Sequence, residues 1–107
     1  MPWFRSDEVR HQAQYEPSGV VYEGNVHIDS EKRHGFGNLT YPDGSTFEGW
    51  FRQGKREGYG SMTSTKNVKY QGFWLTNKYH GTGKLEEQDW VFTGEFDMGR
   101  KHGKGKE

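Results

Sequence analysis

Aromatic residues and glycine alternate along this chain, with polar residues between them. In one stretch Tyr70, Gly72 and Trp74 occupy every second position, and Gly81 and Gly83 follow on the same parity after a short polar segment. A period of two is typical of β-strands, whose successive side chains point to opposite faces of a sheet. The pattern therefore predicts a β-hairpin with one face rich in rings and glycine.

The hairpin pattern recurs about every 23 residues. An aromatic-x-Gly triplet begins each copy, and a Gly-x-Gly motif starts eleven residues after the aromatic residue in three copies and thirteen after it in the first. The first copy therefore contains a two-residue insertion between Val26 and His34. All 16 glycines fit this register. The residues expected to define the repeats are Tyr22, Phe47, Tyr70, Trp74, Phe92 and Phe96, with Gly24, Gly49, Gly72, Gly94, Gly58, Gly81 and Gly103.

Glycine is expected to make room for rings in the neighbouring strand. A ring that lies across a sheet needs a neighbour without a side chain, and the cross-strand contact offsets the weakness of glycine in a strand. Asp43-Gly44 is predicted to be a two-residue turn that leads into the next hairpin. The first turn is placed beside Gly54, and the strands are taken to alternate without interruption. This register pairs Phe47 with Met62, Gly49 with Gly60 and Tyr70 with Leu85. It also places a ring opposite the first glycine of each Gly-x-Gly motif: Phe51 with Gly58, Trp74 with Gly81, and Phe96 with Gly103.

These motifs resemble MORN (membrane occupation and recognition nexus) repeats. The resemblance is carried by Phe47-Glu48-Gly49-Trp50-Phe51 with Gly54 and Gly58-Tyr59-Gly60, and by Tyr70-Gln71-Gly72-Phe73-Trp74 with His80-Gly81-Thr82-Gly83. It covers residues 20–107, with repeats at 22–46, 47–69 and 70–91 and an incomplete one at 92–107. Residues 1–19 form an N-terminal extension, in which 15–19 resemble the tail of a degenerate repeat. The resemblance implies an all-β fold, an elongated single-layer antiparallel sheet of stacked hairpins, and pattern alone predicts about eight strands.

The composition limits both fold and function. The 17 aromatic residues accompany only 3 Leu, 1 Ile, 6 Val and 1 Ala, so a thick aliphatic core is not expected. The 15 basic residues balance 15 acidic ones, there is no cysteine, and no apolar stretch approaches the ~18 residues of a membrane-spanning helix. The N-terminus lacks the apolar core of a secretory signal, so an intracellular location is expected. Residues 6–14 are predicted to form a short helix, because Ser6 suits an N-cap and Asp7 and Glu8 suit a first turn.

A second set of aromatic residues falls on the opposite parity. It consists of Phe36, Trp50, Tyr59 and Phe73, and the predicted register places Trp50 directly opposite Tyr59. An exposed aromatic patch is typical of a protein interface. The alternative is that the N-terminal segment, with Trp3, Phe4 and Val9, folds over these rings. The sequence leaves both interpretations open.

Basic residues follow the first strand of each copy at equivalent positions. They are Lys32, Arg33, Lys55, Arg56, Lys78, Arg100 and Lys101. They are expected to line one long edge of the sheet, while Asp43 and Asp89 mark the other. A row of cations can attract acidic phospholipid headgroups or acidic protein segments. The alternative is that charged turns only keep the repeat soluble.

No catalytic, metal or cofactor site is predicted. His34, His80 and His102 recur before Gly-x-Gly, but equivalent positions in stacked hairpins lie about 10 Å apart, whereas zinc ligands lie about 2 Å from one ion. We expect these histidines to position hairpin turns through hydrogen bonds. The glycine motifs lack the strand, spacing and helix of a phosphate loop. Nucleic acid is an unfavoured partner because the net charge is zero.

The sequence favours a non-catalytic structural or interaction protein, a scaffold within a larger assembly. A single sheet leaves a face and both edges uncovered, and such surfaces invite association. The expected partners are other proteins, bound as a helix in a groove or as a strand added at the C-terminal edge, or a second copy of the chain. The resemblance implies cytoplasm, cytoskeleton or the cilium axoneme as the setting. The alternative function is a peripheral membrane adaptor that binds acidic phospholipids through the basic edge.

Overall fold

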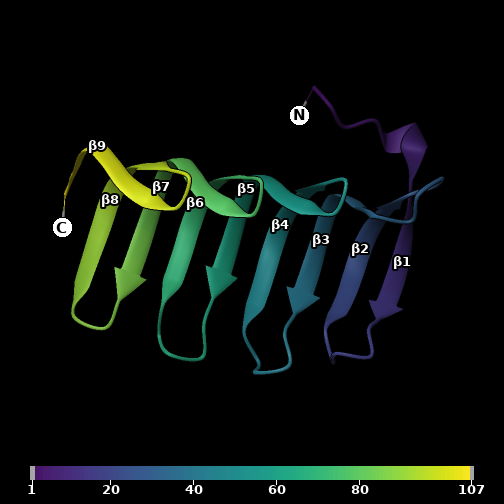
Figure 1. Cartoon of the computed structure of the whole chain (residues 1–107), viewed down its shortest axis with the longest axis horizontal. Coiled ribbons are helices and arrows are strands. Elements are labelled where there is room, and N and C mark those ends of the chain that lie inside the picture. Colours follow the sequence, from purple (N-terminus) through teal and green to yellow (C-terminus); the bar gives the residue numbers. More distant parts are fainter. Residues whose placement is uncertain (1, 107) are drawn as a thin grey trace.

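A computed structural model describes the backbone of residues 2–106 and the side chains of residues 2–102. These residues form one nine-stranded antiparallel sheet whose strand order follows the sequence (Figure 1). The strands are β1 (Val9–Tyr15), β2 (Val21–His27), β3 (Arg33–Thr40), β4 (Thr46–Arg52), β5 (Lys55–Thr63), β6 (Lys69–Leu75), β7 (Lys78–Glu87), β8 (Trp90–Asp97) and β9 (Arg100–Lys106). The predicted all-β, single-layer architecture is confirmed. No helical segment in the described part of the chain has the length and apolarity to cross a membrane.

The predicted helix over residues 6–14 is wrong beyond its first turn. Ser6–Glu8 form a 3-10 turn, η1, without a side-chain cap, and the chain then enters β1. All seven residues of β1 pair with β2, from Val9 opposite His27 to Tyr15 opposite Val21. An isolated helix of two turns is marginal in water, whereas the edge of β2 offers a full ladder of backbone hydrogen bonds. This extra strand raises the predicted eight strands to nine.

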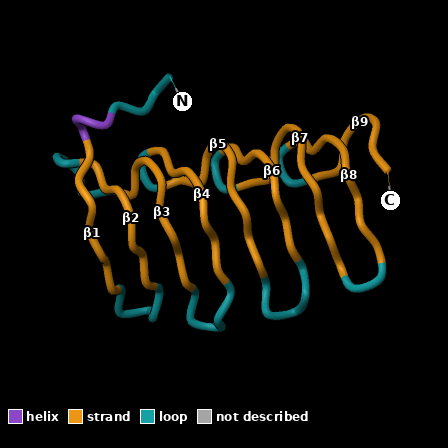
Figure 2. The backbone as a smooth tube through the Cα atoms, turned by 180° about the vertical axis from the view of Figure 1, so that it is seen from behind, coloured by secondary structure: helices purple, strands orange, loops and turns teal. Residues whose placement is uncertain are grey.

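The connections at the two ends of the strands differ. Seen from behind, the loops that link successive hairpins lie at one end and the hairpin tips at the other (Figure 2). Three tips are two-residue turns, 53–54, 76–77 and 98–99, in which both residues have positive φ, as a type I′ turn requires. The first tip is longer and spans 28–31, which confirms the predicted insertion. The predicted two-residue turn at Asp43-Gly44 is a three-residue loop, 42–44, closed by a hydrogen bond from the Tyr41 amide to the Ser45 carbonyl (2.9 Å).

Bulges correct part of the predicted register. Phe47 faces Met62, Gly49 faces Gly60 and Tyr70 faces Leu85 as predicted, but Phe51 faces Arg56, Trp74 faces Tyr79 and Phe96 faces Lys101. In β4 and β5 a single residue, Trp50, lies opposite three residues, 57–59. Gly58 has a φ of +93°, which bends the strand and interrupts the alternation. The pairs Phe51–Gly58, Trp74–Gly81 and Phe96–Gly103 are therefore wrong.

The same glycines instead face rings of the following hairpin. Gly58 lies opposite Trp74 and Gly81 lies opposite Phe96. Within a hairpin, the ring that begins the repeat covers the second glycine of the Gly-x-Gly motif: a Cβ on Gly60 would lie 2.5 Å from Cζ of Phe47. Gly103 lies outside the residues whose surroundings the structure describes. Glycine therefore accommodates rings both within a repeat and between repeats.

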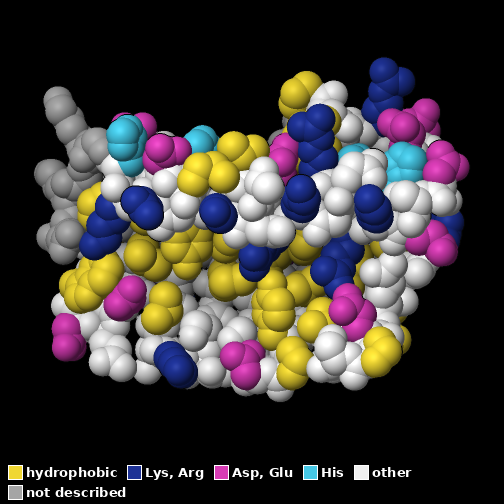
Figure 3. All heavy atoms as spheres, viewed as in Figure 1, with side chains coloured by type: hydrophobic (Ala, Val, Ile, Leu, Met, Phe, Trp, Pro, Cys, Tyr) yellow, Lys and Arg dark blue, Asp and Glu magenta, His cyan; other side chains and the backbone are white. Residues whose placement is uncertain are grey.

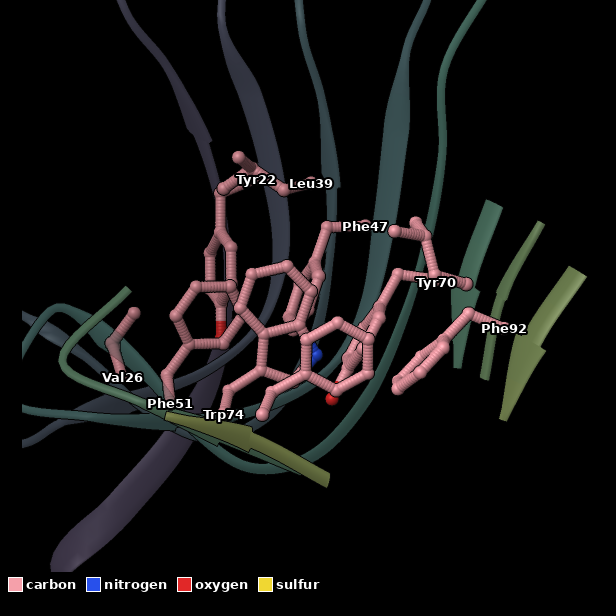
Figure 4. Close-up of a cluster of buried hydrophobic side chains, with 10 residues drawn as sticks. Tyr22, Val26, Leu39, Phe47, Phe51, Tyr70, Trp74 and Phe92 are labelled. Carbon is pink, nitrogen blue, oxygen red and sulfur yellow. The ribbon is translucent and has the colours of Figure 1, made fainter. Parts of the chain in front are cut away.

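One continuous row of hydrophobic side chains, most of them rings, forms the core (Figure 4). The hydrophobic band lies on the face of the sheet that is turned toward the viewer in Figure 3, which we call the front face. The buried members of the row are Tyr22, Val26, Leu39, Phe47, Phe51, Tyr70, Trp74, Leu85, Phe92 and Phe96. The polar atoms of the row are satisfied locally, since the Tyr70 hydroxyl donates to the Phe73 carbonyl (2.8 Å) and Trp74 Nε1 donates to the Gly60 carbonyl (3.1 Å). Burial raises the pKa of Tyr22 and of Tyr70 well above the usual range for tyrosine, so both hydroxyls stay protonated as donors.

Candidate interaction surfaces

The predicted basic edge divides into an inward row and an outward row. The inward row comprises Arg33, Arg56, Tyr79 and Lys101, which follow the hairpin turns at equivalent positions. Arg33 lies 5.3 Å from the Tyr22 ring centroid, Arg56 lies 4.9 Å from that of Trp74, and Lys101 Nζ lies 4.1 Å from that of Trp90. Tyr79 replaces the cation in the third repeat and stacks on Tyr70, with 3.9 Å between centroids. The inward row therefore lies against rings, with Arg33, Arg56 and Tyr79 half-buried and Lys101 exposed.

The outward row comprises Lys32, Lys55, Lys78 and Arg100. All four side chains are exposed, and among the described side chains none of them has an acidic group within ion-pairing distance. Figure 3 shows a row of Lys and Arg side chains above the hydrophobic band of the front face. By contrast, Arg33 of the inward row is ion-paired with Glu16. Each hairpin tip therefore carries one outward cation that is exposed to solvent, whereas the inward cations lie against rings.

The second aromatic set lies on the outer face as two cross-strand pairs. Phe36 faces Trp50 between β3 and β4, with 5.9 Å between ring centroids and an interplanar angle of 77°. Tyr59 faces Phe73 between β5 and β6, at 5.6 Å and 82°. The predicted direct pairing of Trp50 with Tyr59 is wrong, because the bulge sets Trp50 against 57–59 as a group, without a single paired partner among them. We call these the first pair (Phe36 and Trp50) and the second pair (Tyr59 and Phe73).

The N-terminal segment covers Trp50 of the first pair and leaves Phe36 exposed. Residues 2–8 lead back from β1 above the hairpin tips toward β4 (Figure 1). Phe4 packs edge-on against Trp50 at 5.1 Å and Trp3 lies 6.4 Å from Trp50, while the Arg52 guanidinium lies 5.7 Å from the Trp3 ring. Trp50 is half-buried, whereas Phe36, Tyr59 and Phe73 are 42%, 50% and 46% exposed. Coverage by the N-terminal segment is therefore observed at Trp50, and the exposed rings as a protein interface stay a prediction.

The predicted role of the histidines in turn geometry is observed for His34 and His80, where it acts between repeats, and for His102 it stays a prediction. Nδ1 of His34 accepts a hydrogen bond from the Gln53 amide (3.0 Å) in the tip of the next hairpin, and Nδ1 of His80 accepts one from the Met98 amide (3.3 Å). Glu57 takes the equivalent place in the second repeat and pairs with Arg52 (3.1 Å). Burial lowers the pKa of His34, as does the nearby His27 ring, so the neutral imidazole is favoured as acceptor.

The described residues contain no group of three or more His, Asp or Glu side chains placed to hold a metal ion. Two small cavities lie along the front groove, of about 250 Å³ and 230 Å³, and Arg56 and Asn77 line both. Arg56 is fixed there by donating to the Tyr41 hydroxyl (2.9 Å) and to the Asn77 carbonyl (3.2 Å). The groove is thus partly filled by the chain's own side chains.

Comparison with family models gives the same repeats. The MORN repeat model matches residues 32–46, 47–68, 70–86 and 92–107, about two thirds of the chain. The chain belongs to the MORN repeat family. MORN repeats are a non-catalytic repeat type that is generally associated with interactions with proteins or membranes. A search of curated proteins found no significant match.

Sequence reasoning missed two contributions to these MORN surfaces. The guanidinium of Arg52 lies over the Trp3 ring, and Tyr79 takes the place of an inward cation by stacking on Tyr70. The signal for Tyr79 was present, because it occupies the position that Arg56 holds in the repeat before it. No sequence signal distinguished the first pair from the second, since the distinction depends on where residues 2–8 lie.

Proposed function

We propose that this MORN repeat protein is a non-catalytic scaffold that docks partner proteins through the uncovered second pair. The observation that supports this function is the exposure of Tyr59 and Phe73, each about half accessible on the outer face, on the strands that follow β4, whose Trp50 the N-terminal segment already covers. Large aromatic side chains supply much of the binding energy at protein interfaces. A monomer gains little from leaving adjacent rings in water, whereas a docked partner would bury them.

Affinity capture with the tagged full chain tests this function. The variant Tyr59→Ser/Phe73→Ser should lose the proteins that the unmodified chain captures, because it removes both exposed rings. Thr82→Ser/Glu95→Gln is the matched control, since these residues form the equivalent, polar cross-strand pair of the next repeat. Equal capture by all three chains would contradict the proposal.

The resemblance alone supports a cytoskeletal or ciliary assembly as the setting of this role. An assembly of that kind contains many proteins that a thin sheet could bridge, and an intracellular site follows from it. Fluorescence imaging of the tagged full chain in the source cells tests this placement. Signal on filaments or axonemes is expected, and a signal confined to vesicles or nuclei would contradict it.

A second candidate function is a peripheral adaptor that binds acidic phospholipids. The outward row supports it, because it holds one exposed cation at each hairpin tip without an acidic partner among the described side chains. Each basic residue near an anionic bilayer contributes about 1 kcal/mol. Co-sedimentation with phosphatidylserine vesicles should fall when Lys55, Lys78 and Arg100 are replaced by Glu. Replacing Lys66 and Lys69 at the linking end should have a smaller effect, and equal losses would contradict a role for the tips.

A further inference from the structure

We infer that the second pair binds an extended segment of another protein that carries two consecutive aromatic side chains. This inference rests on the proposed function, because it names the partner chemistry of the same surface. Its basis is the repeat itself: the structure contains an equivalent site, one repeat earlier, that is already occupied by such a segment.

The occupied site is formed by Trp50 of the first pair together with His34 and Gly35. Trp3 and Phe4 are consecutive, and both pack there: Phe4 against Trp50 (5.1 Å) and Trp3 against His34 (5.3 Å between ring centroids). Gly35 lies under the Phe4 ring, since a Cβ on Gly35 would lie 2.7 Å from Cε1 of Phe4. The site therefore accepts one ring edge-on against Trp50 and a second ring against His34.

The second pair repeats this geometry at the next position along the sheet. Gly58 and Tyr59 face Trp74 and Phe73. In the occupied site, Gly35 and Phe36 face Phe51 and Trp50 in the same register. The two ring pairs have nearly the same centroid distance and angle, 5.9 Å and 77° against 5.6 Å and 82°. The glycines share the bent backbone, with φ values of +103° at Gly35 and +93° at Gly58.

The two sites differ in the coverage of the glycine and of one ring, while the other ring of each pair, Phe36 or Tyr59, is exposed in both (42% and 50%). Gly35 is buried under Phe4, whereas its counterpart Gly58 is only half-buried. Trp50 is half-buried, whereas its counterpart Phe73 is exposed. The open site also continues directly from the covered one, because β4, which carries Trp50, is the neighbour of β5, which carries Tyr59.

The series ends after the second site. In the next repeat the equivalent pair is Thr82 facing Glu95, which offers no ring to an incoming aromatic side chain. The chain therefore presents one open aromatic site of this type among the described residues. Thr82 and Glu95 serve as the polar control site for binding experiments, because they form the equivalent pair of the neighbouring repeat.

Two substitutions around the second site adjust the chemistry of the ligand. Leu75 stands where Arg52 covers Trp3 in the occupied site, so the second ring would rest on an aliphatic side chain instead of a guanidinium. Glu57 stands where His34 lies, and it is ion-paired with Arg52. Leu75 makes its side of the open site more apolar than the occupied one, and the ion pair with Arg52 offsets the charge of Glu57, which favours an aromatic dipeptide over a charged one.

The occupant is a segment of another protein rather than residues 3–4 of the same chain. Those residues are already engaged with Trp50 and His34, and the segment that follows them is fixed by the Ile28 amide donating to the Glu8 carbonyl (2.9 Å). Moving them to the second site would uncover the first. A second copy has the same engaged segment, so exchange between copies yields no additional aromatic contact.

Binding of a fluorescein-labelled peptide, Pro-Trp-Phe-Arg-Ser, to the full-length chain tests this inference by fluorescence anisotropy. Tyr59→Ser/Phe73→Ser should weaken binding by about tenfold or more, because each edge-on aromatic contact contributes roughly 0.5–1.5 kcal/mol. Thr82→Ser/Glu95→Gln should leave the affinity within about twofold. A peptide with Ser in place of both rings should not bind. Circular dichroism verifies that each variant retains the sheet.

The outcomes separate the inference from the proposed function. Absence of saturable binding to the unmodified chain, or equal affinity for the Tyr59→Ser/Phe73→Ser variant, would overturn the inference. If that variant nevertheless loses its captured partner, the docking function stands and only the aromatic-dipeptide chemistry fails. Concentration-dependent dimers that disappear with Trp3→Ser/Phe4→Ser would also overturn it, because the occupant would then be a second copy.

Discussion

The ring of Phe51 packs edge-on against the ring of Tyr22, the residue that begins the preceding repeat, with 5.3 Å between the centroids. The same contact recurs between Phe47 and Trp74 at 5.1 Å and between Tyr70 and Phe96 at 5.3 Å. Each repeat therefore contributes one ring to its own hairpin and one to the hairpin before it. Stability in such an array depends on the interfaces between neighbours as much as on the repeats themselves.

A double-mutant cycle on Tyr22 and Phe51 tests this coupling. We expect Tyr22→Leu and Phe51→Leu each to lower the free energy of unfolding, and the double variant to lose less than the sum by about 1 kcal/mol, because an edge-on pair contributes roughly that much. Urea unfolding followed by circular dichroism measures it. Tyr22 and Phe96 are the control pair, because their repeats are not neighbours. The losses of unfolding free energy from Tyr22→Leu and Phe96→Leu should therefore add.

The third hairpin tip contains a conformational strain that a substitution should relieve. Thr76 has a φ of +49°, a region that β-branched residues rarely adopt. Asparagine tolerates this region, so Thr76→Asn should raise the free energy of unfolding by about 0.5–1 kcal/mol. Thr82→Asn, at an exposed strand position, should not stabilise the chain. An equal gain from both variants in thermal unfolding would show that the turn geometry is not the cause.

His34 makes stability depend on pH. Its pKa in the folded chain is lowered from 6.5 by burial and by His27, so the unfolded chain binds more protons at mildly acidic pH. The contribution of His34 is fully present above about pH 6.5 and is lost as the pH falls toward the folded-state pKa. Thermal unfolding between pH 7.5 and 5 should show a smaller loss of melting temperature for His34→Gln than for the unmodified chain. Parallel losses in the two chains would refute this linkage.

The alternation of rings and glycine was sufficient to predict the hairpins, the single layer and the insertion in the first repeat. It failed at Gly58 and Gly81, because a parity count assumes an unbroken strand and positive φ values at glycine interrupt it. It also failed at β1, where the sequence has neither glycine nor a repeated ring and only pairing with β2 selects a strand.

The candidate surfaces were predictable as residue sets but not as accessible sites. The equivalent positions of Arg56 and Lys55 within one row gave no indication that the first folds over Trp74 while the second points outward. Strand parity places neighbouring residues on opposite faces of the hairpin. The bulge at 57–59 interrupts the count, so parity alone does not say which of the two residues faces the rings. Coverage of Trp50 depends on a contact between residues far apart in the sequence, which no local pattern contains.

The central claim is that front rings are core and the second pair is available for binding. Urea unfolding of two single variants tests it most directly. Phe47→Ala should lower the free energy of unfolding by about 3–5 kcal/mol, because it empties a fully buried site, whereas Tyr59→Ala should cost about 1 kcal/mol, the value of one exposed ring contact. A loss at Tyr59 as large as that at Phe47 would contradict the account, because Tyr59 would then belong to the core.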